Sequence, residues 1–304
     1  MVRVLFITGF NRSGTTLVTT AVTEAARATT LTVGDLARHL PSIDRFLTAA
    51  RKRATVPDRG VDRLPVNEST PEEYGWLLHA ATGEYTFGAT AADSGTLRTL
   101  VDELANDSDA PVVVLKNPWD TGHEQLLLDH FPDSGALLVR RRLSAIEVSQ
   151  ERAWARIATS NGYVRALISD RRRAAEMLGV VLNPRARQDM VRANRRKARR
   201  DVLRLARGVS KLPLDRVAFL SYDELREDPQ AGAAWAAHML DPEAFGRAIA
   251  AHTFPEYNRF PGYSRASPAG WVARAIDGYW AWSWRRARAK QVRAGILTRR
   301  PRSS

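Results

Sequence analysis

Four short apolar runs separated by long helical stretches dominate the pattern of this chain. Each run is continuously apolar instead of alternating, and β-branched or Leu-rich, which is typical of strands buried on both faces of a sheet. Strands that alternate with helices predict βαβ units and hence a parallel sheet. We therefore expect an α/β fold, a P-loop-like parallel sheet flanked by helices. The four runs are residues 4–7, 111–115, 135–139 and 216–220.

The segments between and after these runs have helical composition. Residues 150–212 contain no strand signal, which predicts a helical insert, and the Trp-rich and basic residues 268–304 predict a C-terminal helix. No repeat and no long Pro/Gly/Ser linker interrupts the 304 residues, so we expect a single domain over 1–304. The helical stretches are 15–29, 93–105, 121–130, 143–157, 163–178, 186–207, 230–240 and 268–293.

The positive charge of the chain is concentrated in two segments. The formal net charge is +13, and residues 165–207 and 285–302 carry +10 and +8 of it, so the remainder has a net charge of −5. Charge of this kind argues for anionic partners and not for a fold. The chain has no Cys, which excludes a disulfide framework, a cysteine nucleophile and a Cys-ligated metal site.

No targeting or membrane segment is visible in the sequence. The first apolar run is shorter than the roughly 7–15 residues of a secretory signal core. No window reaches the roughly 18 apolar residues of a membrane span. We therefore expect a cytoplasmic protein.

The residues that follow each strand are the first candidates for a site, because parallel sheets bind ligands at the carboxyl ends of their strands. Residues 9–16 (Gly-Phe-Asn-Arg-Ser-Gly-Thr-Thr) have the spacing of a phosphate-binding loop that opens a helix. A Walker A loop requires Lys where Thr15 stands, and no strand ends in an Asp suited to Mg²⁺. Arg12 and Lys116 supply cations instead, which predicts an anhydride site that needs no metal.

The same loop carries a family resemblance. Residues 10–17 (Phe-Asn-Arg-Ser-Gly-Thr-Thr-Leu) resemble the loop of sulfotransferases that use 3'-phosphoadenosine 5'-phosphosulfate (PAPS). Three later segments resemble that family in its own order, and together they span residues 4–229. They are Val-Val-Leu-Lys-Asn-Pro at 113–118, the Arg-x7-Ser element at 141–149, and Phe-Leu-Ser-Tyr-Asp-Glu-Leu at 219–225 with Asp-Pro at 228–229.

The resemblance implies a role for each matched residue. Lys116 would stabilise the transition state, and Tyr222 would lie on the nucleoside side. The 3'-phosphate would be held by Arg141 and Ser149, with Arg265 as a late further contact. The 5'-phosphosulfate would be held by Arg12, Ser13, Gly14, Thr15 and Thr16.

The base that takes the acceptor proton is less clearly indicated. The cytosolic phenol- and steroid-type members have a His two residues after the Lys, and Pro118 stands there in this chain. Residues 34–41 (Gly-Asp-Leu-Ala-Arg-His-Leu-Pro) resemble the carboxylate segment of the tyrosylprotein and many bacterial members, which implies Asp35 as the base. Asp35 is equally typical of the first turn of a helix. The alternatives are Glu68, Glu72, Glu73, His39 and His123.

These observations predict a PAPS-dependent sulfotransferase of the bacterial, tyrosylprotein-like branch. It would transfer a sulfuryl group to a hydroxyl of a small-molecule acceptor, hydrophobic or aromatic and belonging to secondary metabolism, and would bind no metal and no nucleic acid. Two alternatives stay open: a P-loop kinase or NTPase acting with Mg²⁺, and a non-enzymatic basic adaptor for nucleic acid or membrane surfaces that uses 165–207 and 285–302.

The C-terminal tail allows two interpretations. Trp271, Trp280, Trp282 and Trp284 precede a cluster of Arg residues, a composition typical of an interfacial helix in peripheral contact with anionic lipid. The tryptophans could equally pack on the core or form the wall of an apolar acceptor pocket.

Overall fold

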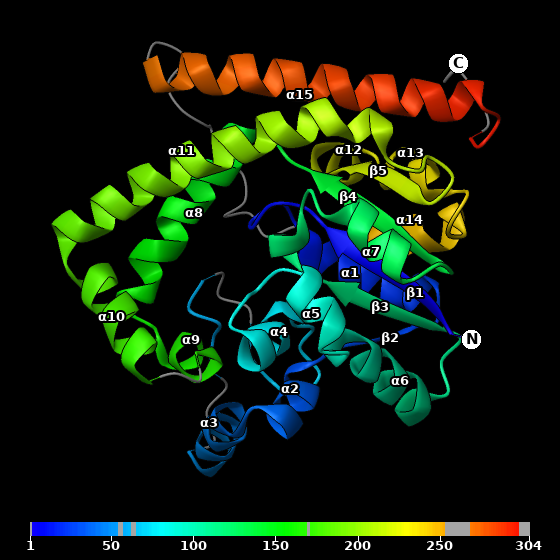
Figure 1. Cartoon of the computed structure of the whole chain (residues 1–304). Coiled ribbons are helices and arrows are strands. Elements are labelled where there is room, and N and C mark those ends of the chain that lie inside the picture. The colour runs from blue at the N-terminus through cyan, green and yellow to red at the C-terminus, as the bar shows by residue number, and fades with distance from the viewer. Residues whose placement is uncertain (1, 54–56, 62–64, 169–170, 253–267, 298–304) are drawn as a thin grey trace.

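The computed structural model describes residues 2–53, 57–61, 65–168, 171–252 and 268–297 and has a five-stranded parallel sheet at its centre (Figure 1). The strand order is β2-β3-β1-β4-β5, and every neighbouring pair is parallel. The predicted α/β fold is confirmed. The strands are β1 Arg3–Thr8, β2 Thr29–Thr30, β3 Val112–Lys116, β4 Ser134–Arg140 and β5 Val217–Ser221. The two-residue β2 was not predicted because it is too short to produce a pattern.

Helices cover both faces of the sheet, because side chains along β1 alternate between two apolar cores. Leu5 and Ile7 join a core with α1 (Thr15–Ala25), α12 (Tyr222–Glu227), α13 (Pro229–Ala233) and α14 (Pro242–Ala251). Val4 and Phe6 join a larger core on the opposite face. That core includes side chains of α2 (Val33–His39), α3 (Pro41–Lys52), α4 (Gly75–Thr82), α5 (Ala89–Asp93), α6 (Thr96–Ser108), α7 (Glu124–His130), α11 (Pro184–Gly208) and α15 (Pro268–Arg293).

The predicted insert forms a helical arm at one side of the sheet (Figure 1). It comprises α8 (Leu143–Ile157), α9 (Gly162–Leu167), α10 (Arg171–Leu182) and the long α11. The single helix expected over 163–178 is wrong, since α9 and α10 are separate helices. A third, smaller apolar core that includes Ile157, Val164 and Val181 holds the arm together.

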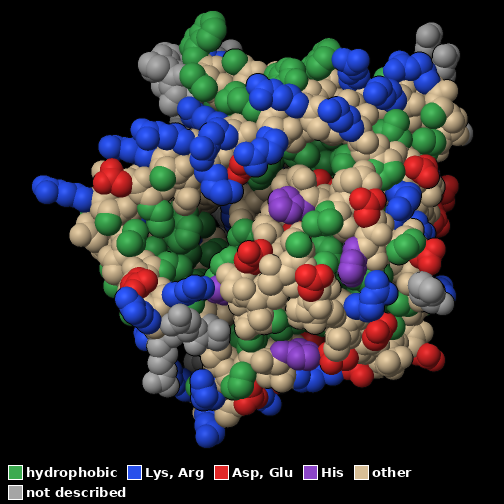
Figure 2. Space-filling model, viewed as in Figure 1, with side chains coloured by type: hydrophobic (Ala, Val, Ile, Leu, Met, Phe, Trp, Pro, Cys, Tyr) green, Lys and Arg blue, Asp and Glu red, His purple; other side chains and the backbone are tan. Residues whose placement is uncertain are grey.

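Part of the basic segment of the arm has a structural role. Arg199 of α11 donates to the buried carboxylate of Glu147 on α8 at 2.6 and 3.0 Å. Arg195 of α11 pairs with Glu151, which is also on α8, at 2.5 Å. These contacts dock α11 on α8, while further Lys and Arg side chains gather on the surface of α11 and α15 (Figure 2).

The C-terminal helix α15 is anchored on the core by two of its four tryptophans. Trp280 and Trp284 are buried, and the buried Arg288 donates to the carbonyl of Phe219 at 2.8 Å. Trp271 and Trp282 are 70% and 47% exposed. The helix therefore packs on the core with one face and presents aromatic rings on the other. None of the described helices is both long and apolar enough to cross a membrane.

Candidate functional site

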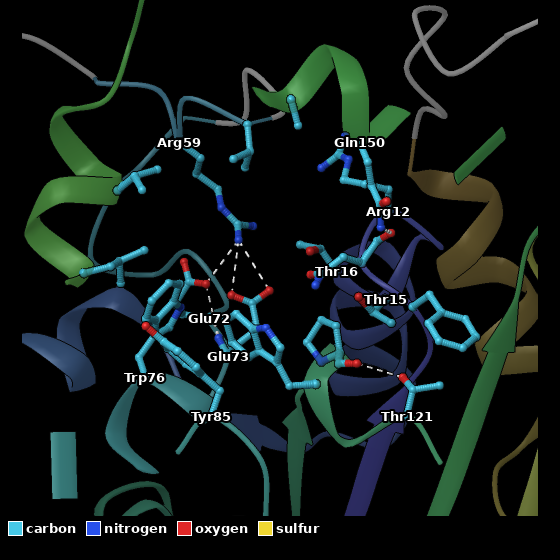
Figure 3. Close-up of a pocket in the computed structure, with 18 of the residues that line it drawn as sticks. Arg12, Thr15, Thr16, Arg59, Glu72, Glu73, Trp76, Tyr85, Thr121 and Gln150 are labelled. Atoms are coloured by element: carbon cyan, nitrogen blue, oxygen red, sulfur yellow. Dashed lines mark hydrogen bonds and ion pairs between the residues drawn. The ribbon is translucent and has the colours of Figure 1, made fainter. Parts of the chain in front are cut away.

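A cavity of about 970 Å³ lies between the loop that precedes α1 and the helical arm. Its lining includes residues that follow β1, β3, β4 and β5, so it opens at the carboxyl ends of the strands, as expected for a parallel sheet. Its volume is at the upper end of the roughly 300–1,000 Å³ of ligand pockets. Figure 3 shows loop residues at one end, aromatic rings at the other, and two carboxylates between them.

The loop end is built around the tight turn that connects β1 to α1. The Ser13 amide donates to the Phe10 carbonyl at 2.8 Å, which closes the turn. Gly14 precedes α1 with a φ of +97°, and a Cβ on it would lie 2.2 Å from the Tyr222 ring. Ser13 is buried, and its Oγ has no hydrogen-bond partner among the described residues. The loop therefore leaves a hydroxyl and a helix N-terminus for an anionic ligand.

Two cations lie together at this loop, Arg12 of the loop itself and Arg141 from the end of β4. Arg12 Nε donates to Ser149 Oγ of α8 at 3.0 Å. Arg141, at the end of β4, donates to the Arg12 carbonyl at 2.8 Å, and its guanidinium lies 4.6 Å from the centre of the Tyr222 ring. Burial lowers the pKa of Arg141. The structure thus brings together Arg12, Arg141, Ser149 and Tyr222, although 210 positions separate the first from the last in the printed sequence.

The two carboxylates are positioned by a short extended segment beside the sheet. The Glu72 amide donates to the Leu31 carbonyl after β2 at 2.9 Å, and the Tyr74 amide donates to the Lys116 carbonyl of β3 at 3.3 Å. This places Glu73 next to the end of β3, where Lys116 Nζ lies 2.9 Å from Glu73 Oε1. Lys116 Nζ also donates to Thr16 Oγ1 at 2.9 Å. A continuous polar path therefore runs from the loop to Glu73.

Arg59 and Tyr163 complete a buried charge cluster around the carboxylates. Arg59 Nη2 lies 3.1 Å from Glu72 Oε1 and 3.4 Å from Glu73 Oε2, and the Tyr163 hydroxyl donates to Glu72 Oε2 at 2.7 Å. Burial raises the pKa of Glu72 to about 8. Burial acts on Glu73 in the same direction, but the nearby Lys116 and Arg59 outweigh it and hold the pKa of Glu73 below its usual range. Glu73 is therefore ionised at neutral pH.

The other end of the cavity begins with three aromatic rings. Trp76 of α4 packs edge-on against Tyr85 and Trp119, with ring centres 5.3 and 5.0 Å apart. Tyr85 and Trp119 stack at 4.8 Å. The buried Asp120 fixes this wall, since it accepts from the Phe87 amide at 2.6 Å and from the Asn117 side chain at 2.7 Å.

Asp35 lies in a different place from the cavity. It is in the first turn of α2, where its carboxylate accepts from the Thr32 amide at 2.8 Å while its own amide donates to the Thr32 hydroxyl at 3.2 Å. It also pairs with Arg38, and it is not among the residues that line the cavity. This is a capping box, the structural alternative for Asp35 that its position in the sequence also allowed.

The remaining candidates for the base also lie outside the cavity lining. Glu68 is exposed and pairs with Arg51 at 3.4 Å. His39 pairs with Glu103 at 3.0 Å, and His123 contacts the Phe87 carbonyl at 3.4 Å. Arg265 lies outside the described residues. Over the described part of the chain, no three His, Asp or Glu side chains gather into a group that could hold a metal ion.

The sequence did not point to Arg59 or to the aromatic wall. Arg59 carries no local motif, and Trp76, Tyr85 and Trp119 belong to two segments that only the fold brings together. The adjacent carboxylates Glu72 and Glu73 were the available signal, and they were among the alternatives for the base.

Comparison with known proteins agrees with the architecture of this site. The model of a family described as the sulfotransferase family matches residues 5–241. The structure is similar to sulfotransferase STF9 from Mycobacterium avium, with a TM-score of 0.56 and 18% identity over 92% of this chain and 76% of that one. It is also similar to sulfotransferase STF1 from Mycobacterium tuberculosis H37Rv, with a TM-score of 0.52 and 16% identity over 93% and 77% of the two chains. No curated protein sequence gives a significant match.

Proposed function

Because the chain belongs to the sulfotransferase family, we propose that it transfers a sulfuryl group from PAPS to a hydroxyl of a small-molecule acceptor. The observation that carries the proposal is the polar path from Thr16 through Lys116 to Glu73, with 2.9 Å at each contact. It joins a phosphate-binding loop to an ionised carboxylate that faces an apolar space. Transfer to a hydroxyl needs both parts of this arrangement.

The residues at the loop end fit a nucleotide that carries several phosphates. The buried Ser13 Oγ lacks a partner among the described residues, and the amides that open α1 are suited to a phosphosulfate. Arg12, Arg141 and Ser149 form a second anion-binding group, suited to a 3'-phosphate. Tyr222 lies against both the loop and Arg141. In this proposal they hold the two ends of PAPS.

The reaction places one demand on each side of the path. PAPS supplies the sulfuryl group: the acceptor oxygen bonds to sulfur as the bond from sulfur to the 5'-phosphate oxygen breaks, leaving adenosine 3',5'-bisphosphate. Glu73 takes the acceptor's hydroxyl proton as that bond forms. Lys116, Arg12 and Thr16 stabilise the negative charge that develops on the sulfuryl and leaving oxygens.

Lys116 also couples the two ends of the site. In the free protein its ammonium lowers the pKa of Glu73, which makes the carboxylate a weaker base. Lys116 would be shared with an anion bound at the loop, so the pKa of Glu73 would rise. Glu73 would then become a stronger base only when the loop is occupied.

Calorimetry with adenosine 3',5'-bisphosphate in the presence of EDTA tests the proposal. We expect the bisphosphate to bind at one site without Mg²⁺. Its binding heat should be lost when Arg12 is replaced by Ala. Binding of Mg-ATP in place of the bisphosphate would instead identify a kinase or NTPase. Salt-dependent binding to DNA, RNA or anionic vesicles without any nucleotide binding would identify an adaptor.

A further inference from the structure

The cavity continues past Glu73 into an apolar arm, a part of the cavity and not the helical arm itself. The transfer chemistry does not use this apolar arm. Its walls come from α8, α9 and α10 and from the chain before them, and they border the third apolar core. Figure 2 shows hydrophobic side chains gathered over this part of the molecule, beside a hollow. The residues that line the arm are Val61, Ile157, Val164, Leu167, Ile168 and Met177. An aliphatic group is the ligand that such walls accommodate at least cost.

The charged side chains at the start of the arm argue against a charged acceptor. Glu73, which Lys116 and Arg59 hold ionised, lines this region together with Glu84, and both would repel an anion. Arg59 lies on both Glu72 and Glu73 and would repel a cation. Arg59 and Lys116 both pair with Glu73, so the charge of this carboxylate is balanced without a ligand. An uncharged acceptor leaves that balance intact.

The aromatic wall lies next to the carboxylate that would receive the proton. In Figure 3, Trp76 and Tyr85 lie on one side of Glu73, and Thr15, Thr16 and Arg12 lie on the other. Trp76 packs against both the main core and the third core, so the ring wall leads directly into the aliphatic arm. A ligand whose hydroxyl lies at Glu73 therefore contacts the aromatic rings close to that hydroxyl and the aliphatic side chains farther from it.

We propose that the acceptor is an uncharged alcohol whose hydroxyl is borne by a ring and which carries an aliphatic tail. The hydroxyl lies at Glu73, the ring on the wall of Trp76, Tyr85 and Trp119, and the tail in the arm of α8, α9 and α10. This inference rests on the proposed sulfuryl transfer, and it specifies which hydroxyl compounds the same site accepts. The products are the sulfate ester of this alcohol and adenosine 3',5'-bisphosphate, with the hydroxyl proton taken by Glu73.

The test uses 4-alkylphenols with tails of increasing length as acceptors for sulfuryl transfer from PAPS. Each methylene that enters the arm should raise kcat/KM by up to about fourfold, which corresponds to the free energy of burying one methylene. Phenols with ethylene glycol tails of the same length should show no such rise. The full-length protein is used, and the sulfate ester is measured by mass spectrometry.

A pair of variants assigns the effect to the arm. Met177 lines the arm and Met190 does not, although both pack partly buried against the third core. Met177→Gln, which keeps the length of the side chain and adds polarity, should lower kcat/KM for the longest tail at least about fivefold more than it lowers kcat/KM for unsubstituted phenol. Met190→Gln should leave kcat/KM unchanged for both acceptors.

The outcomes separate this inference from the proposed function. If adenosine 3',5'-bisphosphate binds and sulfuryl transfer occurs, but tail length has no effect or the ethylene glycol tails are preferred, the inference on the acceptor is overturned and the proposed function stands. Equal losses in Met177→Gln and Met190→Gln would also overturn it. If neither the bisphosphate binds nor any acceptor is sulfated, the proposed function itself fails.

Discussion

The two ends of the cavity are built by different means. The loop end is made of residues that directly follow β1, β4 and β5, held by short hydrogen bonds such as that from Arg141 to the Arg12 carbonyl at 2.8 Å. The opposite end, named the acceptor end because the proposed acceptor binds there, is made of side chains from the helical arm, from α4 and from a loop pinned by Asp120. Sheet topology positions the first end, and packing of a separate small core positions the second. Under the proposed function, the sheet positions the residues of the chemistry, and the helical arm positions those that select the acceptor.

Replacing Gly14 with Ala should have the largest effect on nucleotide affinity and should be confined to the loop end. A Cβ would lie 2.2 Å from the Tyr222 ring, so the loop or the ring must move. We expect the affinity for adenosine 3',5'-bisphosphate to fall at least about 100-fold, or about 2.7 kcal/mol. Calorimetry measures this.

Gly83→Ala is the matched control. Gly83 has a φ of +81° with no atom within 4 Å of its Cβ position, so this variant has the backbone strain without the clash. It should lose about 1–2 kcal/mol of stability and keep wild-type nucleotide affinity. Equal binding by both variants and the wild type would show that the loop does not hold the ligand.

Arg141→Ala should have the next largest effect, specific to the 3'-phosphate. A charge-assisted hydrogen bond contributes about 1.5–3 kcal/mol, so the affinity for adenosine 3',5'-bisphosphate should fall about 10- to 100-fold. Adenosine 5'-monophosphate, which lacks the 3'-phosphate, should lose much less. Arg142, whose side chain is 56% exposed and pairs with Asp223, is the control. Equal losses for the two nucleotides would instead assign Arg141 a role in loop structure alone.

The residues that the structure brings together at the loop end could be selected from the sequence, whereas those of the acceptor end could not, for a physical reason. Glycine spacing, strand ends and cations are local signals, and parallel topology brings strand ends to one edge of a sheet. Arg12, Lys116, Arg141 and Tyr222 could therefore be selected before the fold was known. The wall of Trp76, Tyr85 and Trp119 depends on how a loop folds over Asp120, which no spacing records.

The position of Asp35 illustrates the same limit at a single residue. A carboxylate three residues after Thr32 is typical both of a capping box and of a base segment. Its actual partners, Thr32 and Arg38, are all within or next to α2. Whether such a carboxylate caps a helix or faces a cavity depends on where the start of the helix lies in the fold.

The buried carboxyl of Glu72, between the two ends of the cavity, should make the free energy of unfolding fall as pH rises. Burial raises the pKa of Glu72 to about 8, so between the pKa of an unfolded Glu, about 4.3, and pH 8 the folded chain holds a proton that the unfolded chain releases. The contribution of Glu72 is complete below this window and is lost as pH rises through 8, by no more than about 1.4 kcal/mol per pH unit. Urea unfolding from pH 5 to 9 measures it.

Glu72→Gln provides the comparison for this measurement. Gln cannot lose a proton but can still accept from Arg59 and Tyr163, so the slope of unfolding free energy against pH should be flatter in the variant. Identical slopes in the two proteins would mean that Glu72 is ionised throughout this range.

The outer face of α15 should give the smallest effect, because it belongs to neither end of the cavity. Trp271 and Trp282 are exposed on it, with Arg274 and Arg286 within 5.9 and 5.4 Å of their ring centres. We expect weak sedimentation with anionic vesicles, reduced several-fold in the double variant Trp271→Ala, Trp282→Ala. Sulfuryl transfer to soluble acceptors should be unchanged. Equal sedimentation of both proteins would exclude this face as the contact.

The central claim is that a carboxylate at the end of the Thr16–Lys116 path takes the acceptor proton. It is tested most directly by single-turnover sulfuryl transfer from PAPS to a 4-alkylphenol with wild type, Glu73→Gln and Asp35→Asn. We predict that Glu73→Gln lowers the rate about 10²- to 10⁴-fold without a comparable loss of adenosine 3',5'-bisphosphate binding, while Asp35→Asn stays within a few-fold of wild type. A near-normal rate for Glu73→Gln, with transfer abolished in Asp35→Asn, would contradict the account.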